Sequence, residues 1–501
     1  MTRWGRALLA LIVLGLAALV GTLAWRSRGW PLIHDAPLMH YIAWRIGEGA
    51  VPYRDLFDMN FPGVYLVHLA ALRLFGAGDA GWRAFDLAWL AATSLAAAAL
   101  AARWGRFAAA GAGLFFAAYH LAAGAWQTGQ RDFLLCPFLL LAALGVARWA
   151  ECPGNWSSLA WGGLALGVGL TLKPHAGLMA AALLVLVVVV ARRDASPRGG
   201  APDAAASRAR GARSSVAVVA IFAVALAVPS LAVVAWLGAA GALGAWYEIV
   251  AGYLVPLYSR LGGPERWAFY RWHVWIPIAA GTVLSIGSAI ASRRFAVRHA
   301  VVAVGLGYGV AHYFGQGKGW EYHLYPLAAF AAVALFAELP RLLETGRLAA
   351  LPLAACLVAA GTMLGLKGVE ASDAAWIADK ERRVNAIVAD LDGRLGPGDT
   401  VQVLDTTEAG IHALLRLHAV EPTRFVYDFH FYHDAQTPAI QRLRAEFLAE
   451  LDAHPPKFVV LLERGWPAGG YERVEQFPGL RQRLAAYRVD RRRDGYVVYA
   501  R

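Results

Sequence analysis

Residues 158–191, SLAWGGLALGVGLTLKPHAGLMAAALLVLVVVVA, and the segment after them, 192–213, RRDASPRGGAPDAAASRARGAR, decide how the chain is placed in a membrane. The first segment is apolar and too long for one helix across a hydrocarbon core about 30 Å thick. The second contains six arginines, and short loops rich in Lys and Arg stay on the cytoplasmic side. Two spans joined by a turn at Lys173–Pro174 meet both conditions.

The composition supports an integral membrane protein. Of the 501 residues, 58% are hydrophobic and only 16% are charged, well outside the range of soluble domains. The net charge of +12 comes from arginines in short loops between apolar runs, which membrane topology explains better than a nucleic-acid partner does. The three cysteines provide neither a disulfide framework nor a CxxC metal site.

Windows of about 20 residues predict about eleven membrane spans. They cover roughly residues 7–25, 84–102, 107–124, 132–148, 158–172, 175–191, 215–238, 273–292, 299–314, 323–338 and 348–366. With the N-terminus inside, every arginine-rich short loop faces the cytoplasm. The first apolar run resembles a signal peptide, but no A-x-A site precedes Arg26, so we favour an uncleaved helix.

The chain is expected to have two domains, a membrane domain over residues 1–366 and an extracytoplasmic α/β domain over residues 367–501. Residues 192–213 are expected to be a disordered cytoplasmic linker, because their Ala/Gly/Arg/Ser/Pro composition cannot bury a core. In the second domain, periodicity predicts helices at Trp376–Leu395 and Pro438–Ala453. Strand-like runs lie at Thr400–Leu404, Arg424–Tyr427, Lys457–Leu462 and Tyr496–Tyr499.

The outer loop over residues 26–83 is the strongest place for a functional site. It is too apolar for a free loop: Leu38, Tyr41, Ile42 and Ile46 recur at helical spacing, and residues 64–75 form a second stripe. Such helices lie in the plane of the membrane interface. Asp35 precedes the first of them, where it is either an N-cap or a catalytic carboxylate.

Here the sequence resembles a known family. A first span, then an Asp at the start of an interfacial helix, then G-x-x-P-Y-R-D-x-F-D-x-x-x-P-G, is similar to the GT-C glycosyltransferases of the protein O-mannosyltransferase and lipid A aminoarabinose transferase superfamily (glycosyltransferase family 39 and relatives). The motif spans residues 49–63. Weaker similarity follows at Gln130–Asp132, Leu172–Pro174 and Trp320–Pro326, so the resemblance covers roughly residues 1–366.

The resemblance implies a GT-C-like helix bundle with outer interfacial helices, a polyprenyl-phosphate-linked sugar donor, and Asp35 as general base, with Asp58 as a second acid. Two features depart from the family. Ala36 follows Asp35 where a second acid is common, and the basic residue usual beside the Asp58 position is missing. Both departures concern acceptor geometry and metal binding. No cofactor is predicted, and assistance by a divalent cation stays open.

Sugar transfer from a lipid phosphate also needs positive charge on the departing phosphate. Only five of the 47 basic residues are lysines, so lysines near the outer boundary stand out. The predicted substrate-binding residues are Arg54, Asp55, Arg131, Lys173, Lys318, Glu321 and His323. Each has a plainer alternative: Arg54 and Asp55 as a local ion pair, Arg131 snorkelling beside a partner Asp132, Lys173 as an interface anchor, and Glu321 with His323 capping the tenth span.

The sequence therefore predicts a hexosyl- or pentosyltransferase in the cytoplasmic (inner) membrane, acting at its outer face. The acceptor is a hydroxyl of an envelope glycan, lipid or protein. Alternatives are an outer-face ligase or polymerase with a pyrophosphate-linked donor, and a transporter, although the predicted spans are almost free of charge. Asp405-Thr406-Thr407-Glu408 follows a strand as a capped loop or a ligand site, and we expect this domain to bind an acceptor without catalysing transfer.

Overall fold

The computed structural model describes residues 3–152, 154–194, 204–261, 273–346, 348–372, 375–467 and 469–501. The chain forms two compact units. Unit 1 comprises Met1–Gly29, Phe85–Val234 and Gly262–Asp373, and unit 2 comprises Trp30–Ala84, Ala235–Leu261 and Ala374–Arg501. Residues 30–84, which we expected to belong with the membrane helices, therefore group with the C-terminal residues instead.

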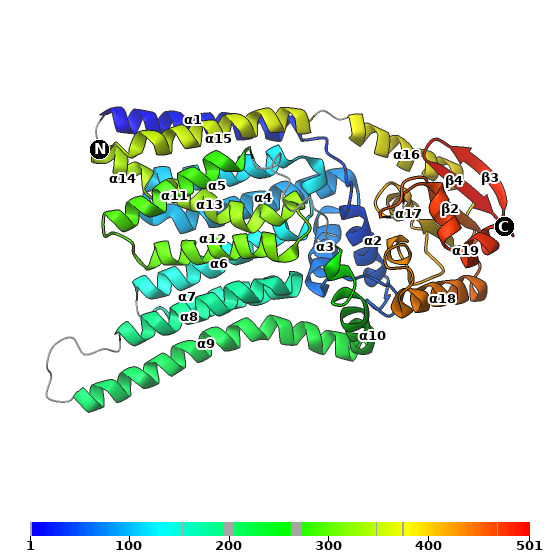
Figure 1. The fold of residues 1–501 in the computed structure, drawn as a ribbon, viewed down its shortest axis with the longest axis horizontal. Coiled ribbons are helices and arrows are strands. Elements are labelled where there is room, and N and C mark those ends of the chain that lie inside the picture. The colour runs from blue at the N-terminus through cyan, green and yellow to red at the C-terminus, as the bar shows by residue number, and fades with distance from the viewer. Residues whose placement is uncertain are drawn as a thin grey trace. The chain divides into compact units, whose positions relative to one another are not determined.

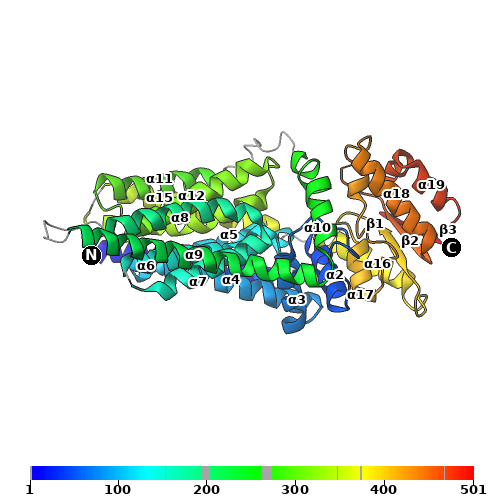
Figure 2. The ribbon, with the colours of Figure 1, turned by 90° about the horizontal axis from the view of Figure 1, so that it is seen from below.

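Unit 1 is a bundle of helices (Figure 1). In chain order they are α1 (Arg3–Arg26), α4 (Asp79–Ala101, in this unit from Phe85), α5 (Arg106–Ala123), α6 (Arg131–Glu151), α7 (Trp156–Leu172), α8 (Gly177–Asp194), α9 (Ala204–Ala239, in this unit to Val234), α11 (Trp275–Ala291), α12 (Val297–Gln316), α13 (Tyr325–Ala337), α14 (Leu339–Glu344) and α15 (Ala350–Ala371). Figure 2, turned by 90°, shows the same helices running alongside one another.

Each of the eleven predicted spans falls on one of these helices, α1, α4 to α9, α11 to α13 and α15. Within the described residues, seven helices are long and apolar enough to cross a membrane, and α7 and α11 are apolar but shorter. The chain is a multi-pass membrane protein. Part of the predicted linker is helical, since α8 extends to Asp194 and α9 begins at Ala204. Alanine and arginine favour helix there, and residues 195–203 lie outside the described part.

Glycine contacts set the spacing of the helices in unit 1. A Cβ on Gly145 of α6 would lie 2.5 Å from the carbonyl oxygen of Ser158 and 2.8 Å from the Cα of Gly162 on α7. A Cβ on Gly309 of α12 would lie 2.5 Å from the Cα of Leu327 on α13. Small residues let helix backbones approach in this way in membranes, where packing replaces the hydrophobic effect as the main driving force.

Unit 2 contains α2 (Ala36–Gly47), α3 (Pro62–Phe75), α10 (Leu243–Ile249), α16 (Ala375–Leu391), α17 (Gly410–Leu417), α18 (Pro438–Ala453) and α19 (Pro478–Leu484). Its strands are β1 (Val401–Leu404), β2 (Phe458–Leu462), β3 (Arg488–Arg493) and β4 (Tyr496–Ala500). They form one sheet in the order β1-β2-β4-β3, with β1 parallel to β2 and the other neighbours antiparallel. α16 and α17 lie on one face of the sheet, and α18 and α19 lie on the other (Figures 1 and 2).

The predicted helices α2, α3, α16 and α18 are confirmed, and so are β1, β2 and β4. The predicted strand Arg424–Tyr427 is wrong. Phe425 makes only an isolated bridge, to Phe57, while its ring stacks on the ring of Phe57. Strand β3 was not predicted, because four of its six residues are arginines.

Candidate functional site

A buried carboxylate organises one end of unit 1. Both oxygens of Asp132, in the first turn of α6, accept hydrogen bonds from the Lys173 Nζ, at 2.8 and 2.7 Å. Lys173 follows the last residue of α7. Asp132 also contacts the Nε2 of His312 near the end of α12, whose Nδ1 lies 3.3 Å from the Tyr308 hydroxyl. One carboxylate therefore links α6, the end of α7 and α12.

Cationic groups surround this carboxylate. Lys318, just beyond α12, is buried, and its Nζ lies 4.9 Å from the ring centroid of Trp320. Burial, together with the nearby charges of Arg131 and Lys173, lowers the pKa of Lys318 to about 6. Burial also lowers the pKa of Lys173 to about 8, although Asp132 opposes the shift. Both shifts arise mainly from burial, and the charge of Arg131 adds a smaller contribution to each.

Two histidines complete this group, which we call the basic cluster: Arg131, Asp132, Lys173, His175, His312, Lys318 and His323. The ring of His312 lies 5.7 Å from that of His175 and 6.0 Å from that of His323, between centroids. Asp132 is the one carboxylate in the group, so the cluster carries a net positive charge. Arginine and lysine in such a setting hold phosphate by charge-assisted hydrogen bonds.

A second group of interacting polar side chains lies at the same end of the helices. The Nε2 of His120, near the end of α5, is 3.2 Å from Asp86 Oδ2 near the start of α4. Its Nδ1 is 2.8 Å from the Tyr325 hydroxyl at the start of α13. All three side chains are buried. Buried ionisable groups inside apolar helices are uncommon without a functional reason, a signal that was visible for Asp86 and His120 in the sequence.

Of the remaining predicted site residues of unit 1, Glu321 and His323, only one belongs to the basic cluster. Glu321 does not join the basic cluster, since its carboxylate contacts Lys367. His323 does, with its buried ring 5.6 Å from that of Trp320. Asp132, the suggested partner of Arg131, contacts Lys173 and His312.

In unit 2, Asp35 lies at the N-cap position of α2, and its side chain makes no capping hydrogen bond to the helix. Its Oδ1 is 3.8 Å from the Nε2 of His34, and both side chains are 30% exposed. His34 has a φ of 62°, in the left-handed region that residues other than glycine rarely adopt. Strained backbone of this kind concentrates at functional sites.

Asp58, by contrast, is enclosed. Its carboxylate accepts hydrogen bonds from the hydroxyls of Tyr65 and Tyr427 and from the Asn60 amide, the last at 2.7 Å. Only 1% of the residue is exposed. Asp58 thus ties the residue 49–63 motif to Tyr427.

Arg54 and Asp55 form the local ion pair that was the alternative, with Arg54 Nε 2.7 Å from Asp55 Oδ1. The other oxygen of Asp55 accepts a hydrogen bond from the Val51 amide at 2.8 Å. The hydrogen bond from Arg54 is the main reason that the pKa of Asp55 lies below its usual value.

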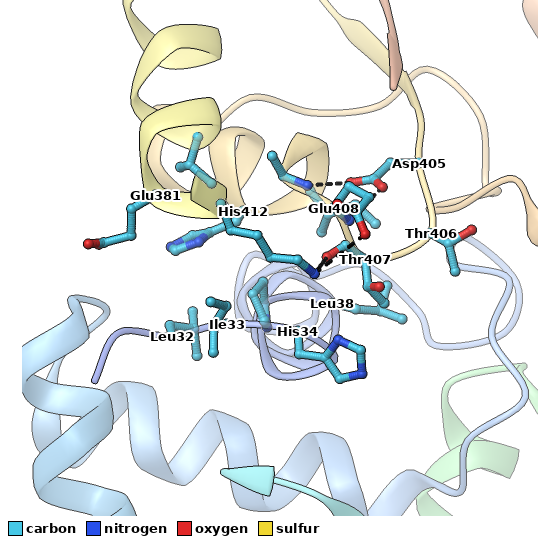
Figure 3. A pocket seen from close by; sticks show the side chains of 15 residues that line it. Leu32, Ile33, His34, Leu38, Glu381, Asp405, Thr406, Thr407, Glu408 and His412 are labelled. Atoms are coloured by element: carbon cyan, nitrogen blue, oxygen red, sulfur yellow. Dashed lines mark hydrogen bonds and ion pairs between the residues drawn. The ribbon is translucent and has the colours of Figure 1, made fainter. Parts of the chain in front are cut away.

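A pocket adjoins His34 within unit 2 (Figure 3). Figure 3 shows His34 and Leu38 on one side and Asp405, Glu408 and His412 on the other. Among the described residues, no group of three or more His, Cys, Asp or Glu side chains could hold a metal ion.

Comparison with solved structures decides the fold. The chain is similar to ArnT from Cupriavidus metallidurans bound to undecaprenyl phosphate, with a TM-score of 0.56, 13% identity and 97% of each chain covered. The chain has the GT-C fold. The apo state of the same ArnT gives a TM-score of 0.53 at 14% identity, again over 97% of both chains. The GT-C resemblance predicted from the residue 49–63 motif is confirmed.

Two further comparisons extend this result. The Archaeoglobus fulgidus oligosaccharyltransferase in complex with Zn and sulfate matches this GT-C chain with a TM-score of 0.50 at 12% identity, over 98% of this chain and 73% of that one. Residues 62–198 match the family described as dolichyl-phosphate-mannose-protein mannosyltransferase. No curated protein matches the chain. The matched family and these structural neighbours are glycosyltransferases.

Proposed function

We propose that this protein transfers a hexosyl or pentosyl group from a polyprenyl-phosphate-linked donor to an acceptor hydroxyl at the outer face of the cytoplasmic membrane. The observation that carries the proposal is the basic cluster, in which Lys173 and His312 meet at Asp132 with Lys318 and Arg131 nearby. A lipid phosphate is an anion that a cationic cluster at the end of membrane-spanning helices can bind. ArnT, which shares the fold, is described as bound to undecaprenyl phosphate.

In this proposal Arg131, Lys173, Lys318 and His323 bind the donor phosphate. Lys173 is held by Asp132 through two hydrogen bonds, so its ammonium has a fixed position before the donor arrives. Fixed cations stabilise developing charge without reorganising during the reaction. Arg54, Asp55, Asp58 and Glu321 then act by positioning, because each is engaged with a neighbouring side chain.

Asp35 is the proposed general base. Its carboxylate takes the proton of the acceptor hydroxyl, the hydroxyl oxygen bonds to the anomeric carbon, and the bond from that carbon to the phosphate oxygen breaks. The departing polyprenyl phosphate keeps the electron pair, and the cations compensate its negative charge. No covalent intermediate on the protein is needed.

The arginine asymmetry of the loops supports a cytoplasmic location for residues 192–213 and an extracytoplasmic one for unit 2. The acceptor is then an envelope glycan, lipid or protein. A ligase using a pyrophosphate-linked donor and a transporter are the functions that the following experiment would separate from this one.

Mass spectrometry of envelope glycans and lipids, from cells with and without the protein, identifies the product and hence the sugar. Transfer of that sugar from its polyprenyl-phosphate donor is then measured with the purified full chain. Asp35→Asn should lower the rate by about 10²–10⁴ with an unchanged melting temperature, because the Asp35 side chain makes no capping hydrogen bond that the change would remove.

Asp392→Asn, a change to an exposed acid of the same unit, serves as the matched control and should leave the rate unchanged. Near-normal transfer by a folded Asp35→Asn protein would remove Asp35 as the base. An unaltered envelope, or transfer only from a pyrophosphate-linked donor, would contradict the proposed function itself.

A further inference from the structure

A second cavity, of about 270 Å³, lies within the C-terminal part of unit 2. Its walls come from β1, β2, α18 and α19, and from the segments that follow the two helices. An engineered protein cavity of about 150 Å³ lined by Leu, Ile and Phe takes up benzene. The cavity beside α18 and α19 therefore has room for a ligand larger than a benzene ring.

The floor of this cavity is hydrocarbon. It is formed by six apolar side chains, two each from the sheet, α18 and α19: Leu404, Val459, Phe447, Leu451, Leu480 and Leu484. Each of these residues is at most 7% exposed, so the floor is recessed and is not a patch on the surface. Five of the six side chains are aliphatic. A recessed aliphatic floor favours a ligand with an apolar body.

Most polar side chains in the walls are already bonded to the protein. The Nε2 of Gln402 lies 3.0 Å from Glu421 Oε1, and its Oε1 accepts a hydrogen bond from the Thr423 hydroxyl at 2.8 Å. The Tyr487 hydroxyl donates to the carbonyl oxygen of Pro456 at 3.0 Å. A ligand rich in hydroxyls or amides would therefore find few available partners in this cavity.

Asp452 and Arg483 neutralise one another at the rim. Arg483 Nε lies 2.9 Å from Asp452 Oδ1, and its Nη2 contacts the other carboxylate oxygen. The third nitrogen, Nη1, donates to the carbonyl oxygen of Gly479 at 3.1 Å. All three nitrogens of this guanidinium are engaged, so Arg483 is not the group that would hold an anionic ligand.

Arg501 is the cation of the rim that is available to a ligand. Among the described residues, its side chain makes no hydrogen bond or ion pair. Burial raises the pKa of Tyr487, and the charge of Arg501 opposes that rise, so the guanidinium lies close to the cavity wall. A guanidinium in this position can hold a carboxylate or phosphate by charge-assisted hydrogen bonds.

We propose that this cavity binds an acyl chain that carries an anionic head group, with the chain on the apolar floor and the head group at Arg501. A free fatty acid and an acyl chain of an anionic lipid share this chemistry. The inference concerns a second ligand of the protein and does not depend on the proposed function.

The test uses the full chain in native membranes. The probe is an octanoate analogue with a diazirine near the end of its chain, and mass spectrometry after photolysis locates the attached residues. Labelling within residues 480–487 should saturate and be displaced by excess octanoate. Ala486→Trp should abolish this labelling by filling the cavity. Ala485→Trp is the matched control, because Ala485 is exposed beside it but outside the lining, and it should leave the labelling unchanged.

The head group is tested separately. Arg501→Gln should raise the half-saturating concentration of the probe about 2- to 5-fold, the usual effect of losing an exposed ion pair. Arg488→Gln, at an exposed arginine of β3 outside the lining, should have no effect. 1-Octanol has the same chain without the charge and should displace the probe less effectively than octanoate. Equal displacement by the two, or an unchanged Arg501→Gln variant, would overturn the proposal.

Dioctanoyl phosphatidate distinguishes the two sources of the ligand. Its displacement of the probe would identify the acyl chain of an anionic lipid, and displacement by octanoate alone would identify a free fatty acid. Labelling of residues 480–487 that does not saturate, or that survives Ala486→Trp, would overturn the inference. None of these measurements needs sugar transfer, so they stand or fall separately from the proposed function.

Discussion

The Nζ of Lys173 bridges both carboxylate oxygens of Asp132, 41 positions earlier in the chain, at 2.8 and 2.7 Å. The lysine side chain is 8% exposed and the aspartate side chain is fully buried. Removing one partner of such a pair leaves a buried charge without compensation, which is costly, whereas removing both often is not. This relationship allows the stabilising role of Lys173 to be separated from a role in binding.

Lys173→Met should lower stability by about 3–5 kcal/mol, the usual cost of breaking a buried ion pair, and weaken the binding of undecaprenyl phosphate. The double variant Lys173→Met/Asp132→Asn should recover most of the stability but not the affinity. Melting temperature and a lipid-binding isotherm on the same samples measure the two effects. Recovery of both together would show that Lys173 acts only in folding.

Binding of the lipid phosphate should weaken as the pH rises from 6 to 9. Lys318, with a pKa of about 6, is mostly neutral at pH 7 in the free protein, and a bound phosphate favours its charged form. Binding at pH 7 should therefore take up a proton. Titration calorimetry in HEPES and in Tris, whose ionisation enthalpies differ, measures this uptake, and Lys318→Met should abolish it. Equal enthalpies in the two buffers would exclude Lys318 from the phosphate site.

Tyr427→Phe removes one of the two tyrosine hydroxyls that donate to the carboxylate of Asp58. We expect a loss of about 1–3 kcal/mol of stability and an unchanged transfer rate per folded molecule, since Asp58 is enclosed. Tyr499→Phe, at a half-buried tyrosine of β4, is the control and should cost little. A large fall in rate without a change in melting temperature would instead give Asp58 a catalytic role.

The predicted sidedness can be tested with a natural marker. Cys152 is exposed between α6 and α7, in a loop predicted to be cytoplasmic. Arg442→Cys places a second exposed thiol in unit 2. A membrane-impermeant maleimide applied to intact spheroplasts should label residue 442 and not Cys152. Labelling of both, or of Cys152 alone, would show that the span count is wrong.

The sequence was informative wherever one stretch of chain decides its own structure. Apolar runs of bilayer length predicted the spans, and helical spacing of Leu38, Tyr41 and Ile42 predicted α2. It was uninformative where contacts with residues distant in the chain determine the local structure. Arg488–Arg493 is strand because β4 pairs with it and Asp390 binds Arg493, at 2.9 Å, neither of which a local pattern contains.

The site shows the same division. Lys173 stood out as a rare lysine at an outer turn, and Asp35 as an acid at a helix start. Their surroundings could not be read from spacing, because His312 lies 180 positions from Asp132. Burying a carboxylate is costly unless cations and hydrogen-bond donors pair with it. The sequence does not say which residues supply that pairing for Asp132.

The contact of Gly145 with Gly162 bears on how this protein would fail under mutation. Gly145 is 13 residues from Asp132 along α6, about 20 Å at 1.5 Å per residue, and yet it fixes the register of α6 against α7, and with it the meeting of Asp132 and Lys173. A methyl group at either glycine would force the two backbones apart or along one another. Gly145→Ala should therefore lower activity even though Asp132 and Lys173 are both intact.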